Sequence, residues 1–112
     1  MSDMTTAISS TARVPTLHAS RYLQQLCKHW GHNLTVAFNE TTGTVTFPRN
    51  ARGADWPGDA TLRLQAHADA LDCRLEASAE GQLEALQGAV SRHLDRFAFR
   101  EAPLAIDWQA AA

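Results

Sequence analysis

Apolar residues recur with two spacings along the chain, and each spacing predicts one kind of element. Over residues 18–32 and 79–99 they recur every three or four positions, which is the period of a helix with one buried face. Elsewhere apolar and polar residues alternate, which is typical of strands with one buried and one wet face. The helix positions predicted to be buried are Tyr22, Leu23, Leu26, Trp30, Leu83, Leu86, Val90, Leu94 and Phe97.

Four alternating runs lie between the two helices and predict four strands, at residues 34–38, 44–47, 61–67 and 71–77. The segment NETTG is predicted to be a turn in which Gly43 supplies a permissive backbone. Further elements are a short first strand that Pro15 confines to a sheet edge, and a last alternating segment that forms either a strand or a tail packed on the core. These two segments span residues 11–16 and 104–108.

This order of elements predicts an α+β fold. A β-α-β-β-β-β-α(-β) chain can form a single curved antiparallel sheet of four to six strands, with both amphipathic helices covering one face. Residues 11–109 are expected to be one domain, preceded by a disordered tail at residues 1–10. The topology is similar to that of the TATA-box-binding-protein fold, an analogy that implies no DNA binding.

Charged residues predict the register of the last hairpin. A two-residue turn at 69–70 sets Arg63 opposite Glu76 and His67 opposite Asp72. A four-residue turn would set Arg63 opposite Arg74, a like-charge pair that costs stability. We therefore predict the register with the two-residue turn.

Composition limits the classes of function. The net charge is −2, which gives no general attraction to nucleic acid or to an anionic membrane. No apolar run approaches the roughly 20 residues of a membrane span, and the first residues do not resemble a signal peptide. A cytoplasmic protein is expected, with Cys27 and Cys73 as free, buried thiols.

The first helix carries a polar face with candidate ligands. His18, Arg21, Gln25, His29 and His32 fall on this face. His29 and His32 could hold a metal if i and i+3 side chains are neighbours there. The alternative is a solvated polar face, and no third ligand is identifiable. Catalytic motifs such as a glycine-rich phosphate loop, Cys-x-x-Cys or His-Glu-x-x-His are absent from the sequence.

The second helix carries His93 between apolar positions. His93 is either a partly buried histidine with one hydrogen-bond partner or a pocket histidine suited to acid–base work or metal ligation. Arg92, Arg96 and Arg100 recur every four residues and could bind carboxylates or phosphates. Alternatively they form a solvated face with Asp95 and Glu101 as partners. The candidate ligand-binding residues are Arg21, His29, His32, His93, Arg96 and Arg100.

The loop 48–58 carries Arg49, Arg52 and Trp56, an aromatic side chain near two cations. It is the lip of a ligand site or a contact for a partner, or else a mobile surface loop whose tryptophan folds back on the core.

Two stretches carry a resemblance to a known family. Residues 19–32 (ASRYLQQLCKHWGH) and 93–108 (HLDRFAFREAPLAIDW) resemble the bacterial domain of unknown function 2218, over residues 11–108 in all. The resemblance implies a small bacterial protein without an established activity or established catalytic residues. It also implies relatives that are fused to siderophore-interacting flavoproteins. The loop 49–58 is longer than in typical members.

Three hypotheses follow from the residues and the resemblance. The first is an accessory binding module linked to iron and siderophore metabolism, whose partner is a siderophore-interacting flavin reductase or a small iron-related ligand. The second is a small lyase or hydrolase with a histidine and arginine pocket. The third is a homodimeric interaction protein without a ligand. No cofactor is indicated, and the first hypothesis is the one we carry forward.

Overall fold

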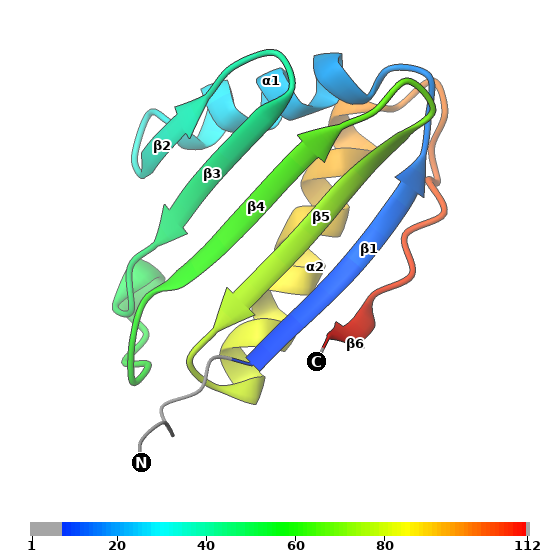
Figure 1. The fold of residues 1–112 in the computed structure, drawn as a ribbon. Helices are drawn as coiled ribbons and strands as arrows, with labels where there is room; N and C mark the ends of the chain where they lie inside the picture. The colour runs from blue at the N-terminus through cyan, green and yellow to red at the C-terminus, as the bar shows by residue number, and fades with distance from the viewer. Residues whose placement is uncertain (1–7, 112) are drawn as a thin grey trace.

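The computed structural model of the chain describes residues 8–111, apart from the side chain of Arg52. It contains one six-stranded antiparallel sheet in the order β2-β3-β4-β5-β1-β6, with both helices on the same face (Figure 1). The α+β class and the order of elements are therefore as predicted. The elements are β1 (Ile8–Pro15), α1 (Ala19–Trp30), β2 (Thr35–Phe38), β3 (Thr42–Phe47), the 3-10 turn η1 (Ala51–Gly53), β4 (Ala60–Ala66), β5 (Ala70–Ala77), α2 (Glu80–Phe97) and β6 (Gln109–Ala111).

The first strand is longer than predicted and lies inside the sheet. Of the predicted tail at residues 1–10, residues 1–7 lie outside the described part, and residues 8–10 begin β1. β1 pairs with β5 over its whole length but with β6 only at Ser9–Thr11. Pro15 has no N–H to donate to a second neighbouring strand. It lies on the part of β1 that pairs with β5 alone.

The core lies between the apolar face of the sheet and the apolar faces of the two helices. The predicted inward residues of β3 and β5 are buried, and the helix residues Leu23, Leu26 and Leu94 have no exposed surface. Phe38 is an exception, at 40% exposed, because it is the last residue of the outermost strand. The buried apolar side chains of the strands are Ala12, Val14, Val45, Phe47, Ala60, Leu62, Leu64, Ala70, Leu71, Cys73, Leu75 and Ala77.

The turn between β2 and β3 lies inside the predicted segment, but Asn39 makes it and Gly43 does not, so the role predicted for Gly43 was wrong. The Asn39 side-chain oxygen accepts hydrogen bonds from the backbone N–H groups of Thr41 at 2.8 Å and Thr42 at 2.9 Å. Gly43 lies inside β3, facing α1. A Cβ at this position would lie 2.8 Å from the Cys27 Sγ atom, so glycine is required there for close packing of helix on sheet.

The β4–β5 hairpin has the register with the four-residue turn. Our prediction of the register with the two-residue turn was therefore wrong. Arg63 lies opposite Arg74, and the turn spans residues 67–70. The opposite charges still meet, because long side chains reach their diagonal neighbours. Arg63 Nε donates to Glu76 Oε1 at 3.1 Å, and His67 Nε2 donates to Asp72 Oδ2 at 2.8 Å.

The segment after α2 packs on the core and then ends in β6. Leu104, Ile106 and Trp108 are half-buried against the core while their neighbours are exposed, as expected for a packed tail. One alternative for the arginines of α2 gave them Asp95 and Glu101 as partners, but these two carboxylates bind other groups. Asp95 accepts from the Leu104 backbone N–H at 3.0 Å. Glu101 accepts from the hydroxyls of Thr16 and Tyr22.

Both thiols are free and buried, as predicted. Burial raises the pKa of Cys27 to about 11. Burial, with a smaller contribution from Asp72, raises the pKa of Cys73 to about 12. Because the thiolate is the reactive form, neither thiol is prepared for nucleophilic chemistry near neutral pH. Within residues 8–111, neither helix is long and apolar enough to cross a membrane.

Candidate functional site

A cavity lies between α1, α2 and the loop that connects β3 to β4. α1 packs over β2, β3 and β4, whereas α2 packs over β5 and β1 (Figure 1). The wedge between them is closed by the end of β3 and by the loop that connects β3 to β4. The cavity has a volume of about 710 Å³, a size typical of small-molecule sites. Its walls include His29, Trp30, Phe47, Trp56, Arg92 and His93.

Aromatic rings form a continuous cluster along this wall. The His93 ring lies 5.0 Å, centroid to centroid, from the rings of both His29 and Trp30. Trp30 meets Phe47 edge to face at 5.3 Å, and His29 meets Phe97 in the same way at 5.7 Å. These separations are those of favourable aromatic pairs. The cluster therefore presents a rigid aromatic surface that contains two titratable rings.

The tautomer of His93 follows from its hydrogen bond. Its Nδ1 atom lies 2.6 Å from the Ala89 backbone carbonyl, one turn earlier in α2. A carbonyl oxygen only accepts, so Nδ1 must donate, and in the neutral ring Nε2 is then the free acceptor. His93 is therefore half-buried with one hydrogen-bond partner, and it also lines the cavity. Its role in acid–base work or metal ligation stays a prediction.

The surroundings of His29 favour the neutral form of its ring. Much of its side chain is exposed, but the ring faces that pack on His93, Trp30 and Phe97 are shielded from water. This desolvation lowers the pKa of His29, and the positive charges of His93, Arg96 and His32 lower it further.

We expect His29 to make stability depend on pH below its ordinary pKa of about 6.5. A histidine whose pKa is lowered by folding binds protons more readily in the unfolded chain. Its contribution is therefore complete above pH 6.5 and is lost as the pH falls through the lowered pKa. Chemical unfolding between pH 7.5 and 5 should show a smaller loss of stability in His29→Gln than in the wild type. The control is His67→Gln on the opposite face, and an unchanged slope in His29→Gln would contradict the assignment.

The loop between β3 and β4 is anchored to α2. The Trp56 ring rests on Gly81, where an added Cβ would lie 3.0 Å from it, so Gly81 makes room for this contact. Gln82, which is buried, donates from Nε2 to the Gly58 carbonyl at 2.9 Å and accepts from the Ser78 N–H at 2.7 Å. Trp56 thus folds back on the helix, as one interpretation expected, and it also lines the cavity. The role of this loop at a ligand site stays a prediction.

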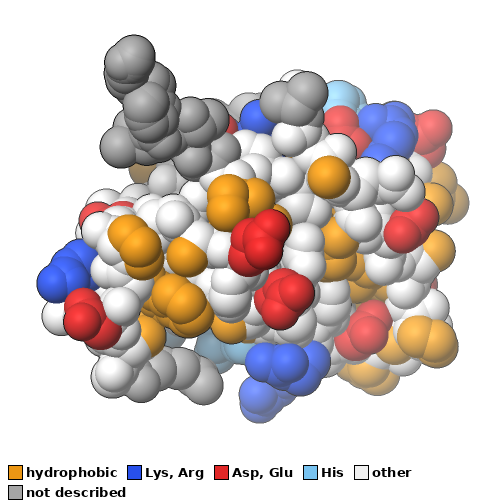
Figure 2. All heavy atoms as spheres, turned by 90° about the horizontal axis from the view of Figure 1, so that it is seen from below, with side chains coloured by type: hydrophobic (Ala, Val, Ile, Leu, Met, Phe, Trp, Pro, Cys, Tyr) orange, Lys and Arg blue, Asp and Glu red, His pale blue; other side chains and the backbone are white. Residues whose placement is uncertain are grey.

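Figure 2 views the end of the molecule at which this loop and the start of α2 lie. Apolar side chains reach the surface there, with acidic and basic side chains between them. No single sign of charge covers this end of the described surface. The charge on this end therefore does not by itself favour an anion or a cation.

The structure brings together only part of the predicted ligand set. His29 and His93 meet at the cavity, whereas Arg21, His32, Arg96 and Arg100 are exposed and do not line it. Arg100 lies beyond α2, with its guanidinium over the exposed Phe99 ring at 5.6 Å. The arginine that reaches the cavity is Arg92, one turn before Arg96. Arg92 lies next to His93 and three residues after Ala89. This position in the sequence does not show that Arg92, and not Arg96 or Arg100, would reach a cavity.

The geometry does not supply the pair expected for a metal. His32 lies in the turn after α1, so the helical i, i+3 relation with His29 does not apply. Among residues 8–111, no three His, Cys, Asp or Glu side chains lie close enough together to hold a metal ion. The metal role of His29 and His32 stays a prediction.

The fold and this cavity define a small α+β domain with a ligand-sized site between its helices and its loop. The chain belongs to the family described as an uncharacterized protein conserved in bacteria, DUF2218, whose model matches residues 11–109. It is similar to a protein solved by NMR, PA4090 from Pseudomonas aeruginosa, with 34% sequence identity and a TM-score of 0.70. The similarity covers 91% of this chain and 95% of that one. No curated protein sequence matches this chain.

Proposed function

We propose that this protein is a small-molecule-binding module whose site is the cavity between α1, α2 and the β3–β4 loop. The observation that carries the proposal is the convergence of His29, His93 and Arg92 on one cavity with tryptophan walls. The three side chains come from two helices, so the tertiary fold is what assembles the site. The chain offers no cofactor motif and no reactive thiol, which favours binding over catalysis.

The lining favours a planar aromatic ligand that carries an anionic group. Trp56 and the histidine rings offer flat stacking surfaces, and His93 Nε2 can accept a hydrogen bond from a ligand hydroxyl. Arg92 can hold a carboxylate or a phenolate. Aromatic hydroxy acids such as catecholates have this chemistry and are also iron-chelating fragments of siderophores. That chemistry and the fused relatives implied by the family support a role in iron handling.

Thermal melting with 2,3-dihydroxybenzoate, its ferric complex and haem tests the proposal. A ligand at 100 times its dissociation constant stabilises the folded protein by about 2.7 kcal/mol and should raise Tm by several degrees. The shift should be lost in His93→Ala and reduced in Arg92→Gln. His67→Ala and Arg49→Gln, both outside the cavity, are the matched controls. A flat panel, or a shift that survives His93→Ala, would overturn this assignment.

A small enzyme is a second candidate, because two histidines and an arginine share the cavity. His93 Nε2 would act as the general base, with Arg92 binding the anionic part of the substrate. Incubation with a panel of aromatic esters and hydroxy acids, followed by mass spectrometry of the products, tests it. Turnover that disappears in His93→Gln supports catalysis, and complete recovery of every substrate counts against it.

The partner and the location follow from the same proposal. A flavin reductase that acts on siderophores is the partner expected of an accessory module, and the cytoplasm is the expected compartment. Affinity capture with a siderophore-interacting reductase as bait tests the first. A homodimer through the edge of β2 is the alternative, and light scattering at micromolar concentration separates a monomer from a dimer.

A further inference from the structure

The helix-free face of the sheet carries two rows of polar side chains that the strand register aligns. The first row, which we call the arginine row, runs Thr44–Arg63–Arg74–Thr11 across β3, β4, β5 and β1. The second row, the aspartate row, runs Thr42–Gln65–Asp72–Arg13 across the same four strands. With neighbouring strands about 4.8 Å apart, each row is about 14 Å long. This face is turned toward the viewer in Figure 1.

A shallow groove of about 590 Å³ lies between the two rows. Its floor is the peptide backbone of the intervening positions Gly43, Leu64, Cys73 and Ala12. The side chains of Leu64, Cys73 and Ala12 point the other way, into the core, and are at most 3% exposed. The walls are therefore the side chains of the two rows, and their charged and hydroxyl ends are the polar groups that the groove offers to a ligand.

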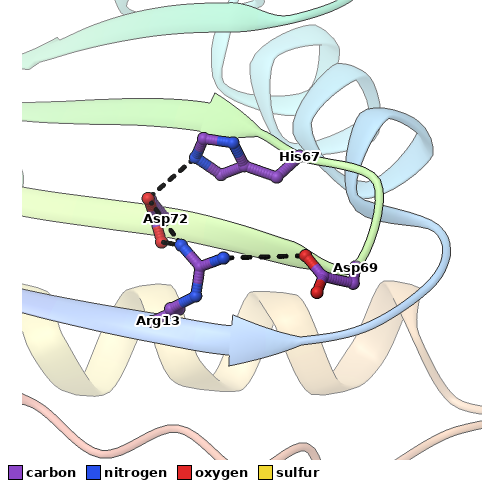
Figure 3. Close-up of polar contacts among 4 residues, drawn as sticks. All are labelled: Arg13, His67, Asp69 and Asp72. Carbon is purple, nitrogen blue, oxygen red and sulfur yellow. Dashed lines mark hydrogen bonds and ion pairs between the residues drawn. The ribbon is translucent and has the colours of Figure 1, made fainter.

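The aspartate row is neutralised internally, as Figure 3 shows. Both Asp72 oxygens accept from Arg13 Nη1, at 2.9 and 3.1 Å. Asp72 Oδ2 also accepts from His67 Nε2 at 2.8 Å, and Asp69 Oδ1 lies 3.6 Å from Arg13 Nη2. This wall of the groove has its arginine and its aspartate already engaged with each other.

The arginine row has more positive charge than its partner can neutralise. Arg63 and Arg74 lie directly opposite each other and share one carboxylate, Glu76. Each uses only its Nε, at 3.1 Å for Arg63 and 3.4 Å for Arg74. Within residues 8–111, the Nη groups of these two arginines have no hydrogen-bond acceptor. One net positive charge is thus spread over two adjacent guanidinium groups.

We propose that this groove binds an oxyanion, the phosphate or carboxylate group of a small ligand, between Arg63 and Arg74. Guanidinium groups bind such anions with two parallel N–H donors, and the unengaged Nη groups supply them. The hydroxyls of Thr44 and Thr11, at the two ends of the row, can donate to the rest of the ligand. A bound anion would also relieve the repulsion between the opposed arginines. The groove lies on the opposite face of the sheet from the His29–His93 cavity, so the two proposals are independent.

An NMR titration of the full chain, with arginine Nε–H signals resolved, tests the proposal. Sodium phosphate and sodium acetate are added at an ionic strength matched by sodium chloride. We expect saturable shifts at Arg63 and Arg74 with phosphate, acetate or both, and at least tenfold weaker binding in Arg63→Gln and Arg74→Gln. Arg49→Gln, in the β3–β4 loop and paired with Asp55 at 2.9 Å, is the control and should bind normally. Equal shifts with chloride would overturn the proposal.

Glu76→Gln gives the sharpest test. If a ligand anion takes a place beside the two arginines, removal of the competing carboxylate should strengthen phosphate binding several-fold. Phosphate should then raise the Tm of this variant more than that of the wild type. If Arg63 and Arg74 serve only their ion pairs with Glu76, the variant loses those pairs and gains no anion affinity, which would contradict the proposal. A response to phosphate alone identifies a phosphate ligand, and a response to acetate alone identifies a carboxylate.

Discussion

Gly43→Ala should destabilise the protein by about 2 kcal/mol, within the range for overfilled cores. The new methyl group would lie 2.8 Å from Cys27 Sγ and 3.3 Å from Leu23 Cδ2, and both side chains are completely buried. Neither can move aside without disturbing the contact between α1 and the sheet. Because small domains are stable by only about 5–15 kcal/mol, the loss is large. Urea unfolding followed by far-UV circular dichroism measures it.

A double mutant separates this contact from a general effect of alanine in a strand. Cys27→Ala removes the sulfur atom and leaves space beside Gly43. The combination of Gly43→Ala with Cys27→Ala should therefore cost clearly less than the sum of the two single changes. Gly58→Ala, whose added Cβ has an ordinary contact of 3.5 Å with Ser78, is the matched glycine control. Strict additivity of the two changes would show that the Cys27 contact is not the cause.

Gln82→Leu should cost about 2 kcal/mol and should also loosen the lip of the cavity. Gln82 is 2% exposed, and leucine fills a similar volume but cannot accept from the Ser78 N–H or donate to the Gly58 carbonyl. A buried N–H without a partner costs more than the bond contributed. Thermal unfolding measures the loss, and amide exchange in residues 54–59 should become faster.

The control for Gln82→Leu is the same substitution at Gln25, which is exposed on α1. A change at an exposed position away from any such network stays within about 0.5 kcal/mol. Equal effects at the two positions would mean that the bonds of Gln82 to Ser78 and Gly58 do not hold the loop. Faster exchange in the loop without a loss of stability would mean that the anchor is local and makes no contribution to the whole fold.

The fold could be predicted because periodicity reports which face of each element is buried. The alternation around Val45 and around Leu75 requires a single buried face, and the predicted class and order follow from it. The β4–β5 register could not be predicted in this way. The two candidate registers differ by two residues, so both keep Leu62 and Cys73 on the buried face. Charge was the remaining criterion, and it failed because Arg63 reaches Glu76 diagonally.

The candidate site was predictable only in part, because it is assembled by tertiary packing. His29 and His93 could be singled out as polar residues beside apolar stripes. Nothing in the sequence relates residue 29 to residue 93, whose rings lie 5.0 Å apart in the fold. Trp56 and Arg92 reach the cavity because a loop folds back on Gly81 and because one turn of α2 faces the wedge. The groove on the other face was missed, since it depends on the β4–β5 register that the charges argued against.

The place of β1 in the sheet has a consequence for how the protein is made. Ile8 pairs with Ala77, and Arg13 with Asp72, so β1 leaves the ribosome well before β5, its partner over its whole length. At about 5–20 residues per second, the strand waits for several seconds. Its other neighbour, β6, follows α2 in the chain, so that side of β1 is completed later still. A nascent chain of this protein therefore exposes an unpaired edge of β1 until β6 has been made, and a chaperone that recognises extended segments would find it there.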